Sequence, residues 1–212
     1  MKLFNAAVFS MAGSAAVLAI TTFAFAASGP TGSGSDSAAA PPKVDTAVDR
    51  FGKLHVPENY RTTYQFLGTW AVARDQGPGS VEMHVLYASP GTIDAYRKDG
   101  HFPDGAVLVK EVYRAATEPM TTGTVSHVDS LRGWFVMVRD RSGHHGTNEV
   151  WGDGWGWSWF DADNTSVASR NLPMKDGVIR PTFDYKANCK GCHAPAVATE
   201  WIYVEGYPPL KR

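Results

Sequence analysis

The sequence predicts an α+β fold that is mainly an antiparallel β-sheet with a few short helices. Runs rich in Val, Thr and aromatic residues, which favour strands, recur between residues 62 and 160. Breaks such as the DQGPG stretch at residues 75–79 separate these runs. The hydrophobic fraction of 43% is ordinary for a globular domain, so the predicted sheet has enough apolar surface to bury a core.

The spacing of the runs predicts about five strands and one or two helices. Residues 92–99 predict a short helix, which Pro90 precedes and Gly100 ends as a C-cap. Residues 44–51 are compatible with another short helix. The predicted strands are residues 62–74, 81–88, 106–115, 134–139 and 155–160.

The chain divides into an export signal, a leader and one domain. A basic start, an apolar stretch and the Ala24-Phe25-Ala26 site predict a signal peptide at residues 1–26, and therefore a periplasmic protein. Residues 27–43 are a flexible Gly/Ser/Ala/Pro leader, and residues 44–212 form the domain. No later apolar stretch approaches the ~20 residues of a membrane span. A net charge of −1 excludes a dedicated nucleic-acid binder.

The motif with specific chemistry is Cys189-Lys190-Gly191-Cys192-His193. C-x-x-C-H is the attachment site of a c-type haem, in which both thiols bond to the vinyl groups and the histidine binds the iron axially. A thioredoxin-like redox pair and half of a zinc site are alternatives. The position near the C-terminus, after several strands, argues against the redox pair, and the scattered histidines argue against zinc. One motif predicts one covalent haem c, with His193 as its iron ligand.

The sixth iron ligand is left open by the sequence. A Met or His there would make an electron carrier. A haem that follows a sheet, instead of opening a helical domain, favours a five-coordinate iron with a vacant face. The candidate ligands are Met83, Met120, Met137, Met174, His84 and His127.

Several stretches in order resemble the cytochrome P-460 family, which includes the β-sheet cytochromes c prime. The resemblance covers about residues 50–210 and implies a compact antiparallel sheet against one c-type haem, in a homodimer. It implies a histidine-ligated iron that is open to small nitrogen ligands. The stretches are residues 56–61 (VPENYR), 85–88 (VLYA), 102–105 (FPDG), 109–111 (VKE), 134–137 (WFVM), 154–156 (GWG), 189–193 (CKGCH) and 207–208 (YP).

The resemblance also suggests distal residues. Arg61 and Glu111 fall where the family carries a polar and an acidic pocket residue; a carboxylate there would act as general base, and an arginine would hold water or an anion. For each, a purely structural role is the alternative. The cytochromes P-460 proper also bond a lysine to the porphyrin. The strand at residues 82–87 has no lysine and carries His84 instead; Lys98 is the nearest alternative.

These features predict a haem enzyme that oxidises hydroxylamine or a related nitrogen oxide and passes electrons to a soluble cytochrome. A non-enzymatic nitric oxide or carbon monoxide binding cytochrome on the same fold is the second hypothesis. A six-coordinate electron carrier is the third.

Overall fold

The computed structural model describes residues 46–163, 165 and 184–211. The predicted signal peptide and leader, residues 1–26 and 27–43, lie outside these ranges. Among the described residues, no helix has the length and apolar composition needed to cross a membrane.

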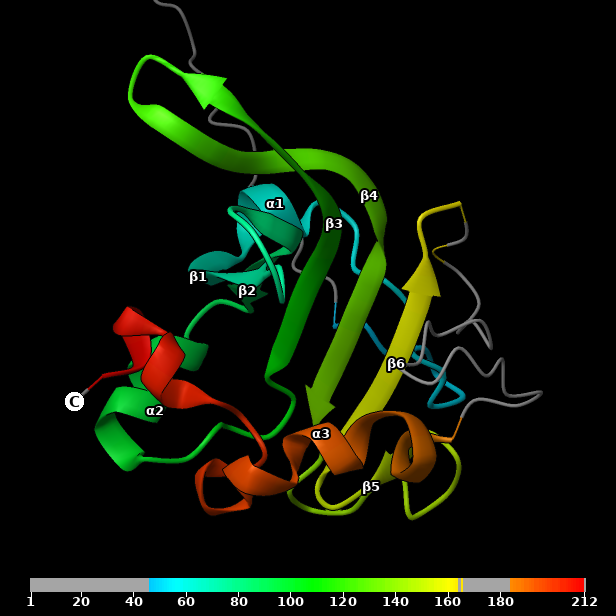
Figure 1. Cartoon of the computed structure of the whole chain (residues 1–212). Helices are drawn as coiled ribbons and strands as arrows, with labels where there is room; N and C mark the ends of the chain where they lie inside the picture. Colours follow the sequence, from blue (N-terminus) through cyan, green and yellow to red (C-terminus); the bar gives the residue numbers. More distant parts are fainter. Residues whose placement is uncertain (1–45, 164, 166–183, 212) are drawn as a thin grey trace, which may run out of the picture. The chain divides into compact units, whose positions relative to one another are not determined.

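The core of the domain is an antiparallel sheet of six strands in the order β1-β2-β3-β4-β6-β5 (Figure 1). This confirms the predicted fold class and three of the five predicted strands closely in position. The bounds are β1 (Gln65–Ala73), β2 (Ser80–Ala88), β3 (Val107–Met120), β4 (Gly123–Arg139), β5 (Trp151–Gly152) and β6 (Trp155–Asp161).

The central strands β3 and β4 are much longer than predicted. They pair from Val107↔Val138 as far as Met120↔Gly123 and form a two-stranded arm beyond the rest of the sheet (Figure 1). Only Leu108–Arg114 of β3 and Gly133–Arg139 of β4 also pair with the neighbouring strands β2 and β6. The sequence of the arm therefore lacks the alternation of apolar and polar residues by which a half-buried strand can be predicted.

The sheet buries a separate core on each face. Alternate side chains of a strand point to opposite faces, so Leu108 and Val112 join one core, while Val107 and Val109 join the other. We call the first face the C-terminal face, because residues 185–210 pack on it, and the second the N-terminal face, because residues 47–64 pack there.

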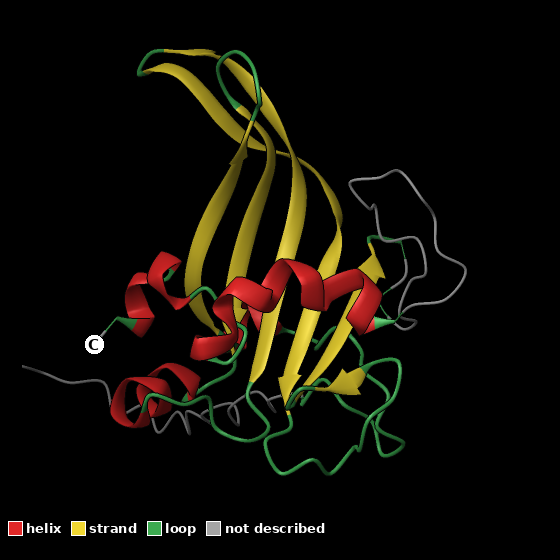
Figure 2. Cartoon of the chain, turned by 60° about the horizontal axis from the view of Figure 1, so that its bottom comes forward, coloured by secondary structure: helices red, strands yellow, loops and turns green. Residues whose placement is uncertain are grey.

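The C-terminal segment crosses the strands as a series of short helices (Figure 2). It packs on Trp155, Trp157 and Trp159, which are all at most 2% exposed. Large aromatic rings supply most of the apolar area in this core. The helices are η1 (Lys186–Lys190), α3 (Gly191–His193), η2 (Ala194–Thr199), η3 (Val204–Gly206) and η4 (Pro208–Leu210).

The two remaining helices are α1 (Tyr60–Thr63) and α2 (Thr92–Asp99). The α2 bounds match the prediction, and Gly100 ends the helix with φ 76°, as expected for a left-handed C-cap. The helix predicted at residues 44–51 is wrong where the structure describes it. Ala47 has φ 62°, and a Val48↔Leu54 bridge closes a turn there instead.

Phe102 tests the core of the C-terminal face. Its ring is 0% exposed and contacts the rings of Tyr96 and Trp155, with centroids 4.6 and 5.5 Å away. Phe102→Ala should lower the free energy of unfolding by about 3–5 kcal/mol, because it leaves a cavity. Phe51→Ala, at a ring that is 79% exposed, should change it by about 0.5 kcal/mol or less. Urea titrations measure both, and equal losses would contradict this packing.

Candidate functional site

Cys189, Cys192 and His193 lie on one short helical run formed by η1 and α3. The Asp184 carboxylate starts the run by accepting the Lys186 backbone N–H at 2.9 Å. Residues three apart on a helix lie on the same side, so the spacing of the two cysteines turns them the same way. Both thiols are free; Cys189 is buried and Cys192 exposed.

The His193 ring is held with one nitrogen committed and the other available. Its Nδ1 lies 2.6 Å from the Trp201 carbonyl oxygen, which can only accept, so Nδ1 carries the proton. The ring packs edge-on against Trp157, with centroids 5.2 Å apart. Burial lowers the pKa of His193, so the imidazole is neutral at pH 7. The unprotonated Nε2 is therefore suited to bind a metal ion.

The Cys189 thiol lacks the low pKa that makes a cysteine reactive in thiol–disulfide exchange. Burial raises its pKa to about 12, although the Lys110 charge lowers it somewhat. Thiol–disulfide exchange requires a thiolate, and catalytic redox cysteines have lowered pKa values. The burial of Cys189 and its raised pKa therefore argue against the thioredoxin-like alternative. For zinc, no group of three or more His, Cys, Asp or Glu suited to a metal occurs among residues 46–163, 165 and 184–211.

Lys110 faces the cysteine motif from the sheet. It is paired with Leu86 and Phe135 on the C-terminal face, and its Nζ lies 4.4 Å from the centroid of the Phe135 ring. Burial lowers its pKa to about 8, whereas the Cys189 and Cys192 thiols act in the opposite direction. The sequence analysis missed this residue. The signal was a charge on the same alternation as Leu108 and Val112, which are apolar and buried.

Glu82, His84 and Arg132 form a polar cluster on the same face. His84 pairs with Val112 in the sheet, and its Nε2–H donates to Glu82 Oε2 at 3.1 Å. Arg132 forms an ion pair with the other Glu82 oxygen. Burial, helped by the Lys110 charge, lowers the pKa of His84 to about 4. His84 is thus a neutral imidazole near Lys110.

Glu111 and Arg61 meet on the N-terminal face. The Glu111 side chain is 2% exposed, and its Oε1 accepts Arg61 Nε at 2.5 Å and the Tyr60 hydroxyl. Its Oε2 accepts the Tyr113 hydroxyl at 3.1 Å. Trp134 Nε1 donates to the Tyr60 oxygen at 2.7 Å, and burial, with the bond to Glu111, raises the pKa of Tyr60. The carboxylate thus accepts three donors.

The structure therefore divides the predicted site residues between the two faces. His84 lies on the face that carries Cys189, whereas Arg61 and Glu111, which do meet each other, lie on the opposite face. Lys98 is exposed on α2. Roles beside an iron for these residues stay predictions.

The candidates for a sixth ligand are also dispersed. Met120 and His127 lie on the arm, where His127 bonds to Glu118 at 2.9 Å. Met137 is 8% exposed within the core of the C-terminal face, and Met174 lies outside the described residues. Met83 pairs with Tyr113, on the face opposite His84.

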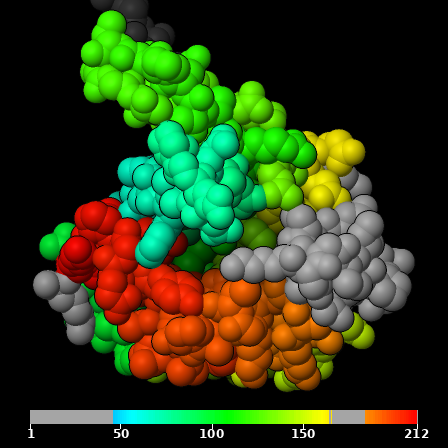
Figure 3. Space-filling view, viewed as in Figure 1, coloured from blue at the N-terminus to red at the C-terminus, as the bar shows by residue number. Residues whose placement is uncertain are grey.

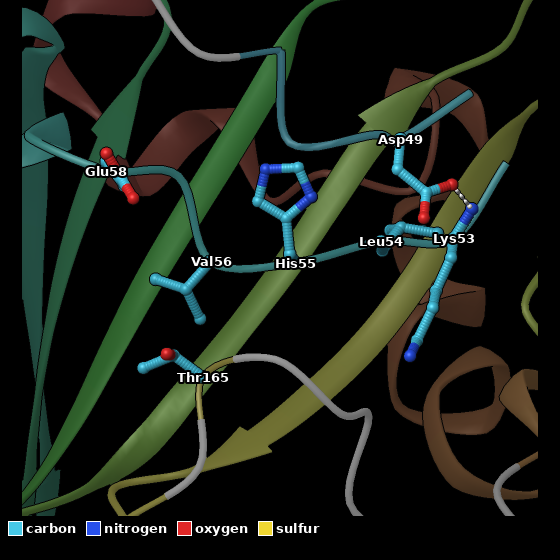
Figure 4. A pocket seen from close by; sticks show the side chains of 7 residues that line it. All are labelled: Asp49, Lys53, Leu54, His55, Val56, Glu58 and Thr165. Carbon is cyan, nitrogen blue, oxygen red and sulfur yellow. Dashed lines mark hydrogen bonds between the residues drawn. The ribbon is translucent and has the colours of Figure 1, made fainter. Parts of the chain in front are cut away.

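The surface is hollowed where the C-terminal segment meets the sheet. Figure 3 shows this hollow between the orange and red C-terminal helices and the cyan residues, with the green strands at its floor. A second, shallow pocket lies among Asp49, Lys53, Leu54, His55, Val56, Glu58 and Thr165. Figure 4 shows that segment running in front of the strands, with the C-terminal helices behind them. That pocket belongs to the N-terminal face and is not near Cys189.

Comparison with known families identifies the family of this chain. Residues 57–204 match the profile of the family described as cytochrome P460, which covers more than half of the chain. The chain belongs to the cytochrome P460 family. It is therefore a haem cytochrome, and the resemblance found in the sequence is confirmed. No individual curated protein matches it.

The residues on the C-terminal face fit the haem of a cytochrome P460 protein. Two thiols on one side of a helical run, followed by a neutral histidine with an available Nε2, are the donors that a c-type haem requires. The apolar indoles of Trp157 and Trp159 lie on the same face. The N-terminal face offers a carboxylate already bonded to three donors.

The pKa of His84 predicts a pH-dependent stability. Because His84 binds its proton near pH 4 when folded and near 6.5 when unfolded, protonation favours the unfolded chain as the pH falls below 6.5. Relative to His84→Gln, the wild type should lose up to about 1.4 kcal/mol per pH unit between pH 6.5 and 4.5.

His127→Gln is the matched control, with the opposite sign. A hydrogen bond to Val128 and the bond to Glu118 raise the pKa of the exposed His127, so the wild type should gain stability relative to this variant as the pH falls toward 6.5. Urea unfolding at several pH values measures both differences. A flat difference for His84→Gln would contradict a neutral, buried His84.

Proposed function

We propose that this chain is an exported cytochrome with one covalently attached haem c. In this proposal His193 is the one axial ligand that the protein gives the iron, and the iron binds and oxidises hydroxylamine or a related nitrogen oxide. The observation that carries the proposal is the hydrogen bond from His193 Nδ1 to the Trp201 carbonyl, which leaves Nε2 available beside Cys189 and Cys192. The family supports the haem; the attachment, the substrate and the export belong to the proposal.

Each part of the site has a task in this proposal. The thiols of Cys189 and Cys192 anchor the haem, and His193 orients it. When bound, the haem supplies a redox-active iron with one vacant face for a small nitrogen ligand. The apolar rings of Phe135 and Trp159, 4.6 Å apart between centroids, limit access of water on this side of the sheet.

Oxidation of hydroxylamine releases protons, so a base is required. We propose His84 for this role. Its Nε2–H is committed to Glu82, which leaves Nδ1 as the unprotonated nitrogen of a neutral ring. The resemblance to the family suggests Glu111 with Arg61 instead. The three donors that already bind the Glu111 carboxylate, and its location on the other face, favour His84.

Binding of nitric oxide or carbon monoxide without turnover is the second candidate. The observation that favours it is the absence of lysine from the strand Ser80–Ala88, where the resemblance to the family would place the porphyrin-bonded lysine. Lys110 faces the cysteines and replaces Lys98 as the residue to test. A bonded lysine would shift the ferrous Soret band far to the red, and Lys110→Met would remove that shift while Lys98→Met would keep it.

The attachment is tested by mass and absorption of the protein matured in a host that assembles c-type cytochromes. We expect the mass of one haem after removal of residues 1–26, and loss of one thioether bond in Cys189→Ser. His193→Ala should keep the covalent haem but change the high-spin spectrum, because the iron loses its axial ligand. A colourless wild type, or an unchanged spectrum in His193→Ala, would refute the proposal.

The base is tested by steady-state oxidation of hydroxylamine with a soluble cytochrome as acceptor. Loss of a general base typically costs ~10²–10⁴-fold in rate, so His84→Gln should lower kcat by about that factor. Glu111→Gln should change kcat far less. The reverse order would assign the base to Glu111, and no turnover by the wild type would favour gas binding.

A further inference from the structure

Two consecutive residues next to the cysteine motif have a backbone conformation that is unusual for their type. Glu200 has φ 56° and Trp201 has φ 69°, both in the left-handed region that non-glycine residues rarely adopt. Such residues persist only where their surroundings hold them, and they concentrate at functional sites. The carbonyl of Trp201 is the group that accepts the His193 Nδ1–H.

The side chain of Glu200 holds this turn in place. Oε2 accepts the Phe102 backbone N–H at 2.8 Å, and Oε1 accepts Arg139 Nη2 at 2.6 Å. His101 Nδ1 lies 3.5 Å from Oε1. Only 17% of the Glu200 side chain and 9% of the Arg139 side chain is exposed, so the ion pair is largely shielded from water.

Arg139 is itself fixed in the sheet. Its Nη1 donates to the Gly154 carbonyl at 2.6 Å, and its guanidinium lies 5.1 Å from the centroid of the Trp155 ring. The indole of Trp155 also donates to the Glu200 backbone carbonyl at 2.9 Å. The peptide group that joins Glu200 to Trp201 is therefore tied to the rigid strands β4 and β6, through both side chain and main chain.

We infer that Glu200, clamped by Arg139 and Phe102, is a positioning residue that fixes the Trp201 carbonyl and thereby the orientation and basicity of His193. This inference rests on the proposed role of His193 as the iron ligand. A hydrogen bond from the second nitrogen of a ligating histidine fixes its tautomer and ring plane and increases its electron donation to the metal. A loosened carbonyl makes His193 a weaker donor.

The test is the midpoint potential and the iron–histidine stretching frequency of the haem-loaded protein. In Glu200→Ala, the potential should shift to more positive values, because the ferric state loses electron donation, and the stretching frequency should fall. Glu200→Gln should restore part of both, since its amide oxygen can still accept one of the two donors. Glu205→Ala, at an exposed carboxylate in the same segment, is the control that removes an equal charge.

The inference is overturned if Glu200→Ala and Glu205→Ala shift the potential and the frequency equally. A wild type that carries no covalent haem would instead refute the proposed function. The inference is then tested on that same haem-free chain by ¹⁵N NMR of the His193 ring. The wild type and Glu205→Ala should hold the Nδ1–H tautomer, and Glu200→Ala should show a mixture of tautomers; an unmixed signal in Glu200→Ala would overturn the inference.

Discussion

The alternation of side chains along β3 is the constraint on which the site depends. Lys110 and Glu111 are neighbours in sequence, yet the pleat sends one to the core of the C-terminal face and the other to the core of the N-terminal face. Two charged groups that are wholly or partly removed from water on one strand are costly unless each has its own compensation. Glu111 has it in Arg61 and two tyrosine hydroxyls; Lys110 lies over the Phe135 ring and has a lowered pKa.

The same alternation gives the two faces different properties. On the N-terminal face, the carboxylate of Glu111 accepts three donors, which suits a structural network. On the C-terminal face, His84 and His193 are neutral imidazoles that each have one committed nitrogen. His84 lies on the sheet, and His193 lies on the helical run that carries the two thiols. Chemistry that needs available nitrogen atoms belongs to the second face. Hydrogen bonds from Arg139 of β4 and Trp155 of β6 hold Glu200, and they thereby fix the turn whose Trp201 carbonyl accepts the His193 N–H.

Local patterns were sufficient for much of the fold. The helix Thr92–Asp99 and strands such as Ser80–Ala88 have clear ends and apolar runs, so their positions could be predicted. The outer halves of β3 and β4 could not, because Thr117, Glu118 and Ser126 pair across the arm without burying an apolar face. The turn at Ala47 depends on the bridge between Val48 and Leu54, and local composition does not predict that pairing.

The site was predictable where the chemistry is local in sequence. Cys189, Cys192 and His193 follow from one five-residue motif. Residues brought in by the sheet are harder to assign. The family resemblance named Arg61 and Glu111 together, and the structure brings them into contact, but on the face opposite the cysteines, which only the strand register determines. Lys110 and Glu200 were missed for the same reason, because their partners are far away in sequence, at Phe135, Phe102 and Arg139.

The location of the haem on the C-terminal face is the central claim, and a crystal structure of the ferric, haem-loaded protein tests it most directly. The claim predicts electron density for thioether bonds to Cys189 and Cys192, and iron bound to His193 Nε2 on the side of the sheet that carries Lys110 and His84. Iron on the side of Glu111 and Arg61, or a cysteine motif without iron, would contradict it.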